Sequence, residues 1–161
     1  MFVIGCDPGM SGAIAALDTL TGTLRVIDMP VTKDPKGRTC IDPYELLEIL
    51  RPPSGTRFMA VVEHVHAMPK QGVSSSFNFG EGYGALKMAI AAHHIPVQFV
   101  TPAIWKKHFG LSSDKGLSRG LASNRFPANA KDFIRIKDDG RAEAALLALY
   151  GQEKLMSKIQ P

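Results

Sequence analysis

The stretch MFVIGCDPGMSGAIAALD, residues 1–18, decides the fold of this chain. Phe2 to Cys6 is apolar and predicts a buried strand, and Gly12 to Leu17 predicts the next one. The segment between them holds the proline and glycines of a tight turn, so the two strands should pair antiparallel. Asp7 stands at the end of the first strand, where a buried carboxylate needs a cation, a proton or a hydrogen-bond donor. It either caps the turn through nearby backbone N–H groups or belongs to a site.

The rest of the chain alternates between strand and helix patterns. A third strand is predicted from Gly22 to Met29, and the polar segment from Val31 to Thr39 predicts a surface loop. Later helices are expected at 42–50, 81–94, 103–109, 115–125 and 141–150, strands at 57–63 and 97–100, and a polar connection at 68–78. Three antiparallel strands followed by alternating helices and strands indicate an α/β fold, with a mixed five-stranded sheet flanked by helices.

Length and composition favour a single domain over residues 1–161, with an ordinary hydrophobic content of 45% and a charged content of 21%. No apolar run approaches the ~18 residues of a membrane helix, and we expect no membrane association. No cationic segment precedes an apolar stretch at the N-terminus, so no secretory signal is expected. Cys6 and Cys40 lack metal-finger spacing and fit a reducing cytoplasm.

Positive charge concentrates between residues 101 and 131. Six lysines and arginines face a single acid there, Asp114, so this stretch alone carries +5, more than the +4 of the entire chain. Such clustering suits contacts with phosphates. A solvated helical face would give the same pattern, and charge alone does not decide between the two.

Acidic residues recur at places that can converge. Glu63, like Asp7, ends an apolar strand, and ligands gather beyond the carboxyl ends of parallel strands. Asp139 and Glu143 are four residues apart, so they share one face at the start of the last helix. Acids in a first turn also favour helix capping, which remains an alternative for Asp138 and Asp139. Glu143 is flanked by alanines and should enter the packed layer, where a carboxylate needs a specific reason.

The residue types point to a hard cation. Four carboxylates without histidine–cysteine spacing favour Mg²⁺ or Mn²⁺ over zinc. Two such ions about 4 Å apart can support phosphodiester hydrolysis. The basic stretch would then hold a nucleic-acid backbone.

These residues together resemble a known family, the RuvC-type Holliday junction resolvases of the RNase H-like superfamily, in a compact form similar to those of bacteriophages. The resemblance covers nearly the whole chain and is carried by residues 4–9, 61–66, 80–92, 105–115 and 140–144. It implies an RNase H-like fold and a homodimer that binds four-way DNA junctions. It also implies symmetric nicking of two strands with Mg²⁺, for which Mn²⁺ can substitute, and no nucleotide cofactor.

The resemblance also implies roles for individual residues. The catalytic and metal-binding carboxylates would be Asp7, Glu63, Asp139 and Glu143. The cellular enzymes have their last two acids three residues apart, whereas Asp139 and Glu143 are four apart; either spacing keeps one helical face, and Asp138 is an alternate to Asp139. The last acid is Glu rather than Asp, which adds reach. Lys106 or Lys107 and Lys115 would lie close to the scissile phosphates, and His66 would either stack on a base or be only a surface loop residue. We expect Lys70 and Arg119 to be further DNA contacts.

Three other functions compete with junction cleavage. A protein of the same fold could bind branched DNA without cutting it, or a nuclease could also accept flaps and forks. The turn from Asp7 to Gly12 also resembles the first phosphate loop of actin-like ATPases and sugar kinases. Those proteins need two such domains, for which 161 residues leave no room.

Overall fold

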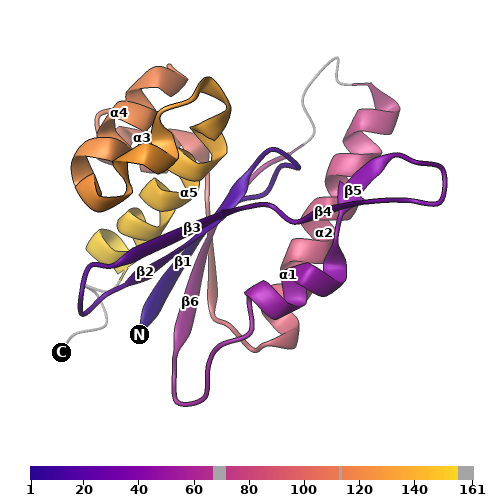
Figure 1. Ribbon diagram of the computed structural model, residues 1–161, viewed down its shortest axis with the longest axis horizontal. Coiled ribbons are helices and arrows are strands. Elements are labelled where there is room, and N and C mark those ends of the chain that lie inside the picture. Colours follow the sequence, from indigo (N-terminus) through magenta and orange to yellow (C-terminus); the bar gives the residue numbers. More distant parts are fainter. Residues whose placement is uncertain (67–71, 113, 156–161) are drawn as a thin grey trace.

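A five-stranded mixed sheet forms the centre of the protein in our computed structural model, which describes residues 1–66, 72–112 and 114–155 (Figure 1). The strand order is β3-β2-β1-β6-β7. The strands are β1 (Phe2–Asp7), β2 (Ala13–Asp18), β3 (Leu24–Asp28), β6 (Phe58–Glu63) and β7 (Val97–Val100). β1, β2 and β3 pair antiparallel, whereas β6 pairs parallel with both β1 and β7. The predicted sheet, with three antiparallel strands followed by parallel pairs, is confirmed.

Helices cover both faces of this sheet (Figure 1). One face is covered by α1 (Pro43–Ile49) and α2 (Val73–Ala92), the other by α3 (Pro102–His108), α4 (Lys115–Arg125) and α5 (Asp139–Tyr150). Short helical turns complete the chain: η1 (Pro127–Phe133), η2 (Ile136–Asp138) and η3 (Gly151–Leu155). None of the helices in the described ranges combines the length and apolar character that crossing a membrane requires.

Strand β1 separates two hydrophobic cores. Val3 belongs to the core beneath α5, whereas Ile4 and Cys6 belong to the core beneath α1 and α2. Because successive side chains of a strand point to opposite faces, Gly5 and Asp7 lie on the α5 side with Val3. A Cβ atom on Gly5 would lie 2.0 Å from the carbonyl oxygen of Ala144, so only glycine lets α5 approach β1 this closely.

Two local predictions are wrong. The segment from Val31 to Thr39 is not a loop throughout, because β4 (Val31–Lys33) and β5 (Thr39–Ile41) pair as a small antiparallel sheet. Helix α2 starts at Val73 rather than Glu81, so the expected polar connection fails from residue 73 onward, and residues 68–71 of it lie outside the described part of the chain. Serine and glycine give this segment weak helix propensity, and its residues 73–80 are exposed or half-buried. Gly82 lies against Ile41 of β5, where a Cβ would be 2.7 Å from Cγ1.

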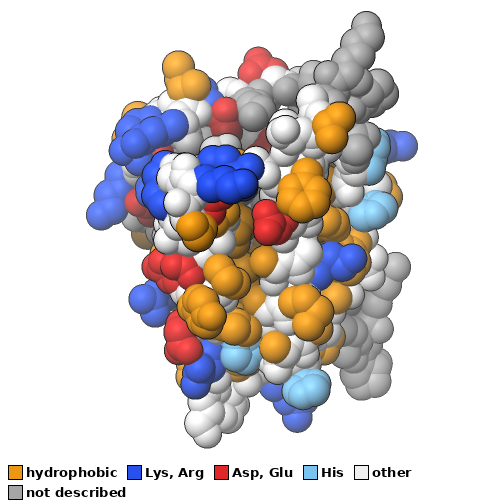
Figure 2. Space-filling view, turned by 90° about the vertical axis from the view of Figure 1, so that its right-hand side faces the viewer, with side chains coloured by type: hydrophobic (Ala, Val, Ile, Leu, Met, Phe, Trp, Pro, Cys, Tyr) orange, Lys and Arg blue, Asp and Glu red, His pale blue; other side chains and the backbone are white. Residues whose placement is uncertain are grey.

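Helix α2 also carries an apolar stripe on its exposed side. Val73, Phe77 and Met88 are exposed and recur at spacings that return to one side of a helix. Gly80 and Gly84 lie between them, and a Cβ at either position would meet nothing within 4 Å. Figure 2 looks onto the side of the molecule that bears α2 and the β4–β5 hairpin, and hydrophobic side chains gather on it.

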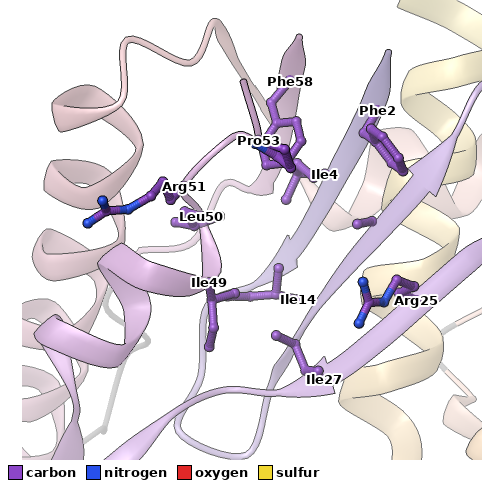
Figure 3. Close-up of a pocket in the computed structure, with 11 residues that line it drawn as sticks. Phe2, Ile4, Ile14, Arg25, Ile27, Ile49, Leu50, Arg51, Pro53 and Phe58 are labelled. Carbon is purple, nitrogen blue, oxygen red and sulfur yellow. The ribbon is translucent and has the colours of Figure 1, made fainter. Parts of the chain in front are cut away.

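A cavity of about 380 Å³ opens on the α1 side of the sheet (Figure 3). Its walls include Ile4, Ile14 and Phe58, with Arg25 and Arg51 among the lining residues. Ile4 and Ile14 point away from α5. The cavity therefore has no part in the cluster of acids described next.

Candidate functional site

Two acids meet at neighbouring strand ends. β1 and β6 run parallel in a register that pairs Cys6 with Val62, so Asp7 and Glu63 occupy the next position on each strand. Both side chains lie on the face covered by α5, because they alternate with residues of the opposite core. Glu63 is only 9% exposed. The register therefore places a half-buried and a buried carboxylate side by side at one edge of the sheet.

The first turn of α5 adds further acids to this edge. Gly140 packs directly on the turn after β1, and a Cβ at that position would lie 3.0 Å from Oδ2 of Asp7. Asp139 precedes Gly140, and Glu143 follows one turn later on the same helix. The N-terminal end of a helix also stabilises negative charge. The fold thus brings Asp139 and Glu143 to the edge of the sheet that holds Asp7.

Glu143 is buried among alanines, with 7% of its surface exposed. Its Oε1 accepts a hydrogen bond of 2.8 Å from Nζ of Lys106, in the last turn of α3. Charge-assisted hydrogen bonds of this kind are stronger than neutral ones. Removing either partner alone would leave an uncompensated charge in a nearly dry environment.

Glu63 has a different kind of partner. Its Oε1 accepts a hydrogen bond of 2.9 Å from the indole Nε1 of Trp105, which is fully buried. Trp105 precedes Lys106 on α3, so two consecutive residues of this helix contact the acids of β6 and α5. The chemistry of the two contacts differs, since the indole is a neutral donor and the ammonium is a cation.

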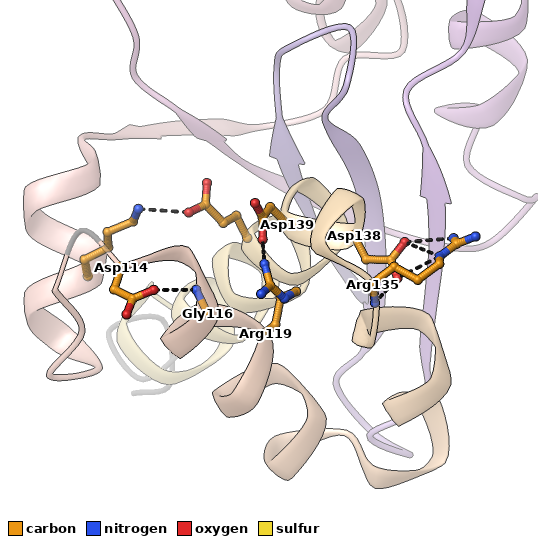
Figure 4. A network of polar contacts seen from close by, with 8 residues as sticks. Asp114, Gly116, Arg119, Arg135, Asp138 and Asp139 are labelled. Atoms are coloured by element: carbon orange, nitrogen blue, oxygen red, sulfur yellow. Dashed lines mark hydrogen bonds and ion pairs between the residues drawn. The ribbon is translucent and has the colours of Figure 1, made fainter.

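The two consecutive aspartates before Gly140 have separate roles (Figure 4). Asp139 forms an ion pair with Arg119 of α4, and both side chains are mostly buried. Asp138 is 1% exposed and accepts hydrogen bonds from the backbone N–H of Arg135 at 2.8 Å and from its guanidinium at 2.8 to 3.1 Å. Hydrogen bonds from the Arg135 side chain hold the pKa of the Asp138 carboxyl below its ordinary value. Asp138 therefore braces the turn that leads into α5.

An ion pair that sequence patterns did not suggest ties α5 to β3. The guanidinium of Arg141 donates two hydrogen bonds to Asp28, of 2.6 and 2.7 Å. The same contact lowers the pKa of Asp28 and raises that of Arg141. This bidentate pair fixes the first turn of α5 over the antiparallel half of the sheet.

The donor set suits a hard divalent cation. Asp7, Glu63, Asp139 and Glu143 offer carboxylate oxygens from three elements, which are the ligands that Mg²⁺ and Mn²⁺ prefer. Within residues 1–66, 72–112 and 114–155, however, no three side chains of His, Cys, Asp or Glu are arranged to hold a metal ion. Lys106 and Arg119 pair with Glu143 and Asp139 instead. Metal binding at these carboxylates would therefore have to compete with two internal cations.

The residues predicted to bind DNA, and the acid among them in sequence, lie at different places in the structure. Lys106 and Lys107 line a surface hollow of about 510 Å³ on α3, next to the Glu143 contact. Asp114, the single acid of the basic stretch, caps α4 through the N–H of Gly116 (Figure 4). His66 is exposed shortly after β6. The side chain of Lys115 and the whole of Lys70 lie outside the described part of the structure.

Sequence reasoning missed two residues that matter here. Trp105 fits a core position by its type, and it is buried, but its bond to Glu63 spans 42 residues and leaves no periodic signal. Its position directly before Lys106 was the available hint. Arg135 braces Asp138 at a spacing of three residues, a local pairing that the sequence could have suggested.

The fold belongs to a recognisable class. A mixed five-stranded sheet whose first three strands are antiparallel, flanked by helices, is the fold class that the sequence predicted. Solved structures of RuvC from Thermus thermophilus match nearly the full chain. One, of RuvC itself, has a TM-score of 0.62 and 16% identity, and the match covers 95% of this chain and 96% of that one. Another, of T. thermophilus RuvC in complex with a Holliday junction substrate, has a TM-score of 0.61, 17% identity and 96% coverage of each chain.

These similarities show a RuvC-type fold. The sequence itself matches no protein-family model and no curated protein. The predicted fold class is therefore confirmed by structure, while activity has to be argued from the site.

Proposed function

We propose that this protein is a metal-dependent endonuclease that resolves four-way DNA junctions, with residues 1–161 forming one nuclease domain. The observation that carries the proposal is that Asp7 and Glu63 end neighbouring parallel strands of a RuvC-type sheet, and that the first turn of α5, which carries Asp139 and leads to Glu143, packs against the turn after β1. One of the two similar structures was solved with a Holliday junction substrate.

The four carboxylates would hold Mg²⁺, or Mn²⁺ in its place. Two ions there would activate a water molecule and stabilise the leaving oxygen of a phosphodiester. Of the two consecutive aspartates, we assign Asp139 rather than Asp138 as a metal ligand. The Asp138 carboxylate already accepts four hydrogen bonds from Arg135. Glu143 occupies a buried position of α5, and its longer side chain would extend it toward the ions.

The basic residues would hold the DNA backbone. Lys106 and Lys107 flank a hollow beside the acids, and Arg119 lies next to Asp139. Divalent ions at the acids would compete with Lys106 and Arg119 for the carboxylates, and each released side chain could then contact a phosphate. Lys70 and Lys115 are proposed as further phosphate contacts and His66 as a base-stacking residue, from the family resemblance.

A homodimer would place two such sites on the two strands to be cut. The exposed Val73, Phe77 and Met88 on one side of α2 support this, because they would give a second copy of the chain an apolar surface to cover. Gly80 and Gly84 would let a second backbone approach closely. We expect sedimentation to give a dimer and Phe77→Glu to give a monomer. A monomeric wild-type protein would contradict the dimer.

The decisive experiment uses a labelled four-way junction and matched duplex, fork and flap substrates, each with Mg²⁺ or with EDTA. Paired symmetric nicks in the junction alone, dependent on Mg²⁺, are the expected result. Equal cutting of forks and flaps would indicate a broader branched-DNA nuclease. No cleavage of any substrate with Mg²⁺ or Mn²⁺ would refute the proposed enzyme.

A second candidate function is binding of branched DNA without cleavage. It is favoured by the ion pairs that Lys106 and Arg119 make with Glu143 and Asp139, since these could be permanent structural contacts. Tight junction binding that is indifferent to divalent ions, with intact substrate throughout, would support it. A rise in junction affinity on adding Ca²⁺ would instead favour a metal site at the acids.

A further inference from the structure

Trp105 is buried against the candidate site rather than only within the core. Its indole N–H donates to Oε1 of Glu63 at 2.9 Å, and no surface of the side chain is exposed. An indole has one donor and no acceptor, so this bond uses its entire hydrogen-bonding capacity. A buried tryptophan N–H needs a partner, and here the partner is one of the four converging acids.

Trp105 also lies next to the contact made by the following residue. Nζ of Lys106 is 5.1 Å from the centroid of the Trp105 ring, within the range of a cation–π interaction. The same Nζ binds Oε1 of Glu143. The indole thus contacts Glu63 through its edge and lies beside the ammonium that pairs with Glu143.

We infer that Trp105 is a positioning residue that fixes the orientation of Glu63 toward a bound divalent ion. This rests on the function proposed above. A hydrogen bond to one carboxylate oxygen fixes the plane of the carboxylate, and with it the direction of the second oxygen. Partners behind a metal ligand commonly set its orientation in this way, and their removal typically lowers metal affinity or activity about 10- to 100-fold.

Because Trp105 is the only tryptophan in the chain, its indole N–H gives a single resonance in a ¹H–¹⁵N correlation spectrum. The hydrogen bond to Glu63 makes this resonance sensitive to the charge on that carboxylate. The wild-type protein therefore contains its own reporter of metal binding at Glu63.

The test combines this resonance with one pair of variants. Trp105→Phe keeps an aromatic ring in the core and removes the N–H. Phe133→Leu is the packing control, because Phe133 is buried in the same hydrophobic core but is not among the acids or their partners. Calorimetric titration with Mn²⁺ measures metal affinity, and thermal unfolding identifies any variant that does not fold.

We expect the indole resonance of the wild-type protein to move on titration with Mg²⁺, and Glu63→Gln to shift it and abolish that response. Trp105→Phe should weaken Mn²⁺ binding about 10-fold or more, whereas Phe133→Leu should stay within about twofold of wild type. Higher Mn²⁺ concentration should restore part of the cleavage rate of Trp105→Phe, as expected for a loss of metal affinity.

Two results would overturn the inference while leaving the proposed nuclease intact, provided that the wild-type protein cleaves junctions normally. One is an indole resonance that does not move at saturating Mg²⁺. The other is a Trp105→Phe protein that binds Mn²⁺ with wild-type affinity. A wild-type protein that neither binds Mn²⁺ nor cuts any branched substrate would refute the proposed function itself. The wild-type spectrum supplies the deciding observation even where Trp105→Phe fails to fold.

Discussion

The two faces of the central sheet are formed by the same strands but differ in their side chains: one face is packed by apolar side chains, and the other ends in acids. On the α1 and α2 face, Ile4, Cys6 and Val62 contribute only to packing, and a largely apolar cavity opens between the elements. On the α5 face, the alternate residues lead to Asp7 and Glu63 at the strand ends. One strand thus serves packing on one side and a polar cluster on the other, because side chains alternate.

The face with the acids is also the more tightly constrained. α5 lies so close to β1 that Gly5 has no room for a Cβ, and nearly every residue of α5 is buried. Polar groups placed in such an environment need defined partners, and each acid described there has one or more. Tight packing therefore holds the acids in place, which is what a preorganised site requires.

The largest expected effect contrasts one residue from each face. Asp7→Asn should lower junction cleavage by roughly 100-fold or more, beyond the effect of altering an outer partner of a metal ligand, while junction binding persists. Ile4→Val, on the opposite face, should leave cleavage unchanged and lower the free energy of unfolding by about 1 kcal/mol. Single-turnover kinetics and urea unfolding measure the two quantities. Normal cleavage by Asp7→Asn would exclude a catalytic role for this acid.

The second comparison replaces glycine with alanine on either side of the sheet, at Gly5 beneath α5 and at Gly82 on α2. Gly5→Ala would place Cβ 2.0 Å from Ala144 O and 2.5 Å from Ala148 N, both backbone atoms that cannot rotate away. We expect a loss of about 3 kcal/mol in unfolding free energy, at the upper end of overpacking costs. Gly82→Ala meets the side chain of Ile41 instead, and its gain in helix propensity of about 1 kcal/mol should offset most of that clash. Equal losses in urea unfolding would contradict the difference in packing.

The third comparison concerns two ion pairs on the α5 side that differ in which partner is buried: the acid Asp138 is buried beside an exposed Arg135, whereas Asp28 is largely exposed. Asp138→Asn should cost about 2 kcal/mol at pH 7, because its carboxylate is buried and accepts charged hydrogen bonds. Asp28→Asn should cost less than about 1 kcal/mol, since Asp28 is largely exposed. Chemical unfolding of both variants beside wild type measures the costs.

The contribution of Asp138 to the free energy of unfolding should also decrease as the pH is lowered. Its folded-state pKa lies below the ordinary value of 3.8, so the stabilisation is complete above that value and is lost as pH falls through the lower folded pKa. The difference between wild type and Asp138→Asn should therefore shrink below about pH 4. A difference that stays constant down to pH 2 would contradict this assignment.

Local patterns predicted much of the fold. Strand β7 and helix α4 have the bounds that the sequence indicated, Val97–Val100 and Lys115–Arg125. The helix expected at 42–50 is present as α1 over Pro43–Ile49, capped by Asp42. The β4–β5 hairpin and the early start of α2 were missed. The strands of the hairpin lack an alternating apolar pattern, and the first part of α2 is rich in serine and glycine, which favour helix weakly.

The acids of the candidate site were also visible in the sequence, because Asp7 and Glu63 end apolar strands and Glu143 lies in an otherwise apolar helix, four residues after Asp139. Their partners were not. The contacts of Arg119 with Asp139 and of Lys106 with Glu143 link residues 20 and 37 positions apart, and no periodicity encodes such pairs. Sequence therefore indicated which carboxylates to consider as a site, and the fold was needed to show the side chains that pair with them.

The smallest expected effect tests the packing face through its cysteine. Burial, with a smaller contribution from the neighbouring Asp7 charge, raises the pKa of the Cys6 thiol to about 12, so its reactive thiolate is scarce at neutral pH. Cys40 on β5 is partly exposed. Ellman's reagent should label one thiol in the native protein and both in denaturant, with no loss of junction cleavage in the labelled native form. Rapid native labelling of Cys6 would mean that the α1 and α2 face opens more readily than its buried core indicates.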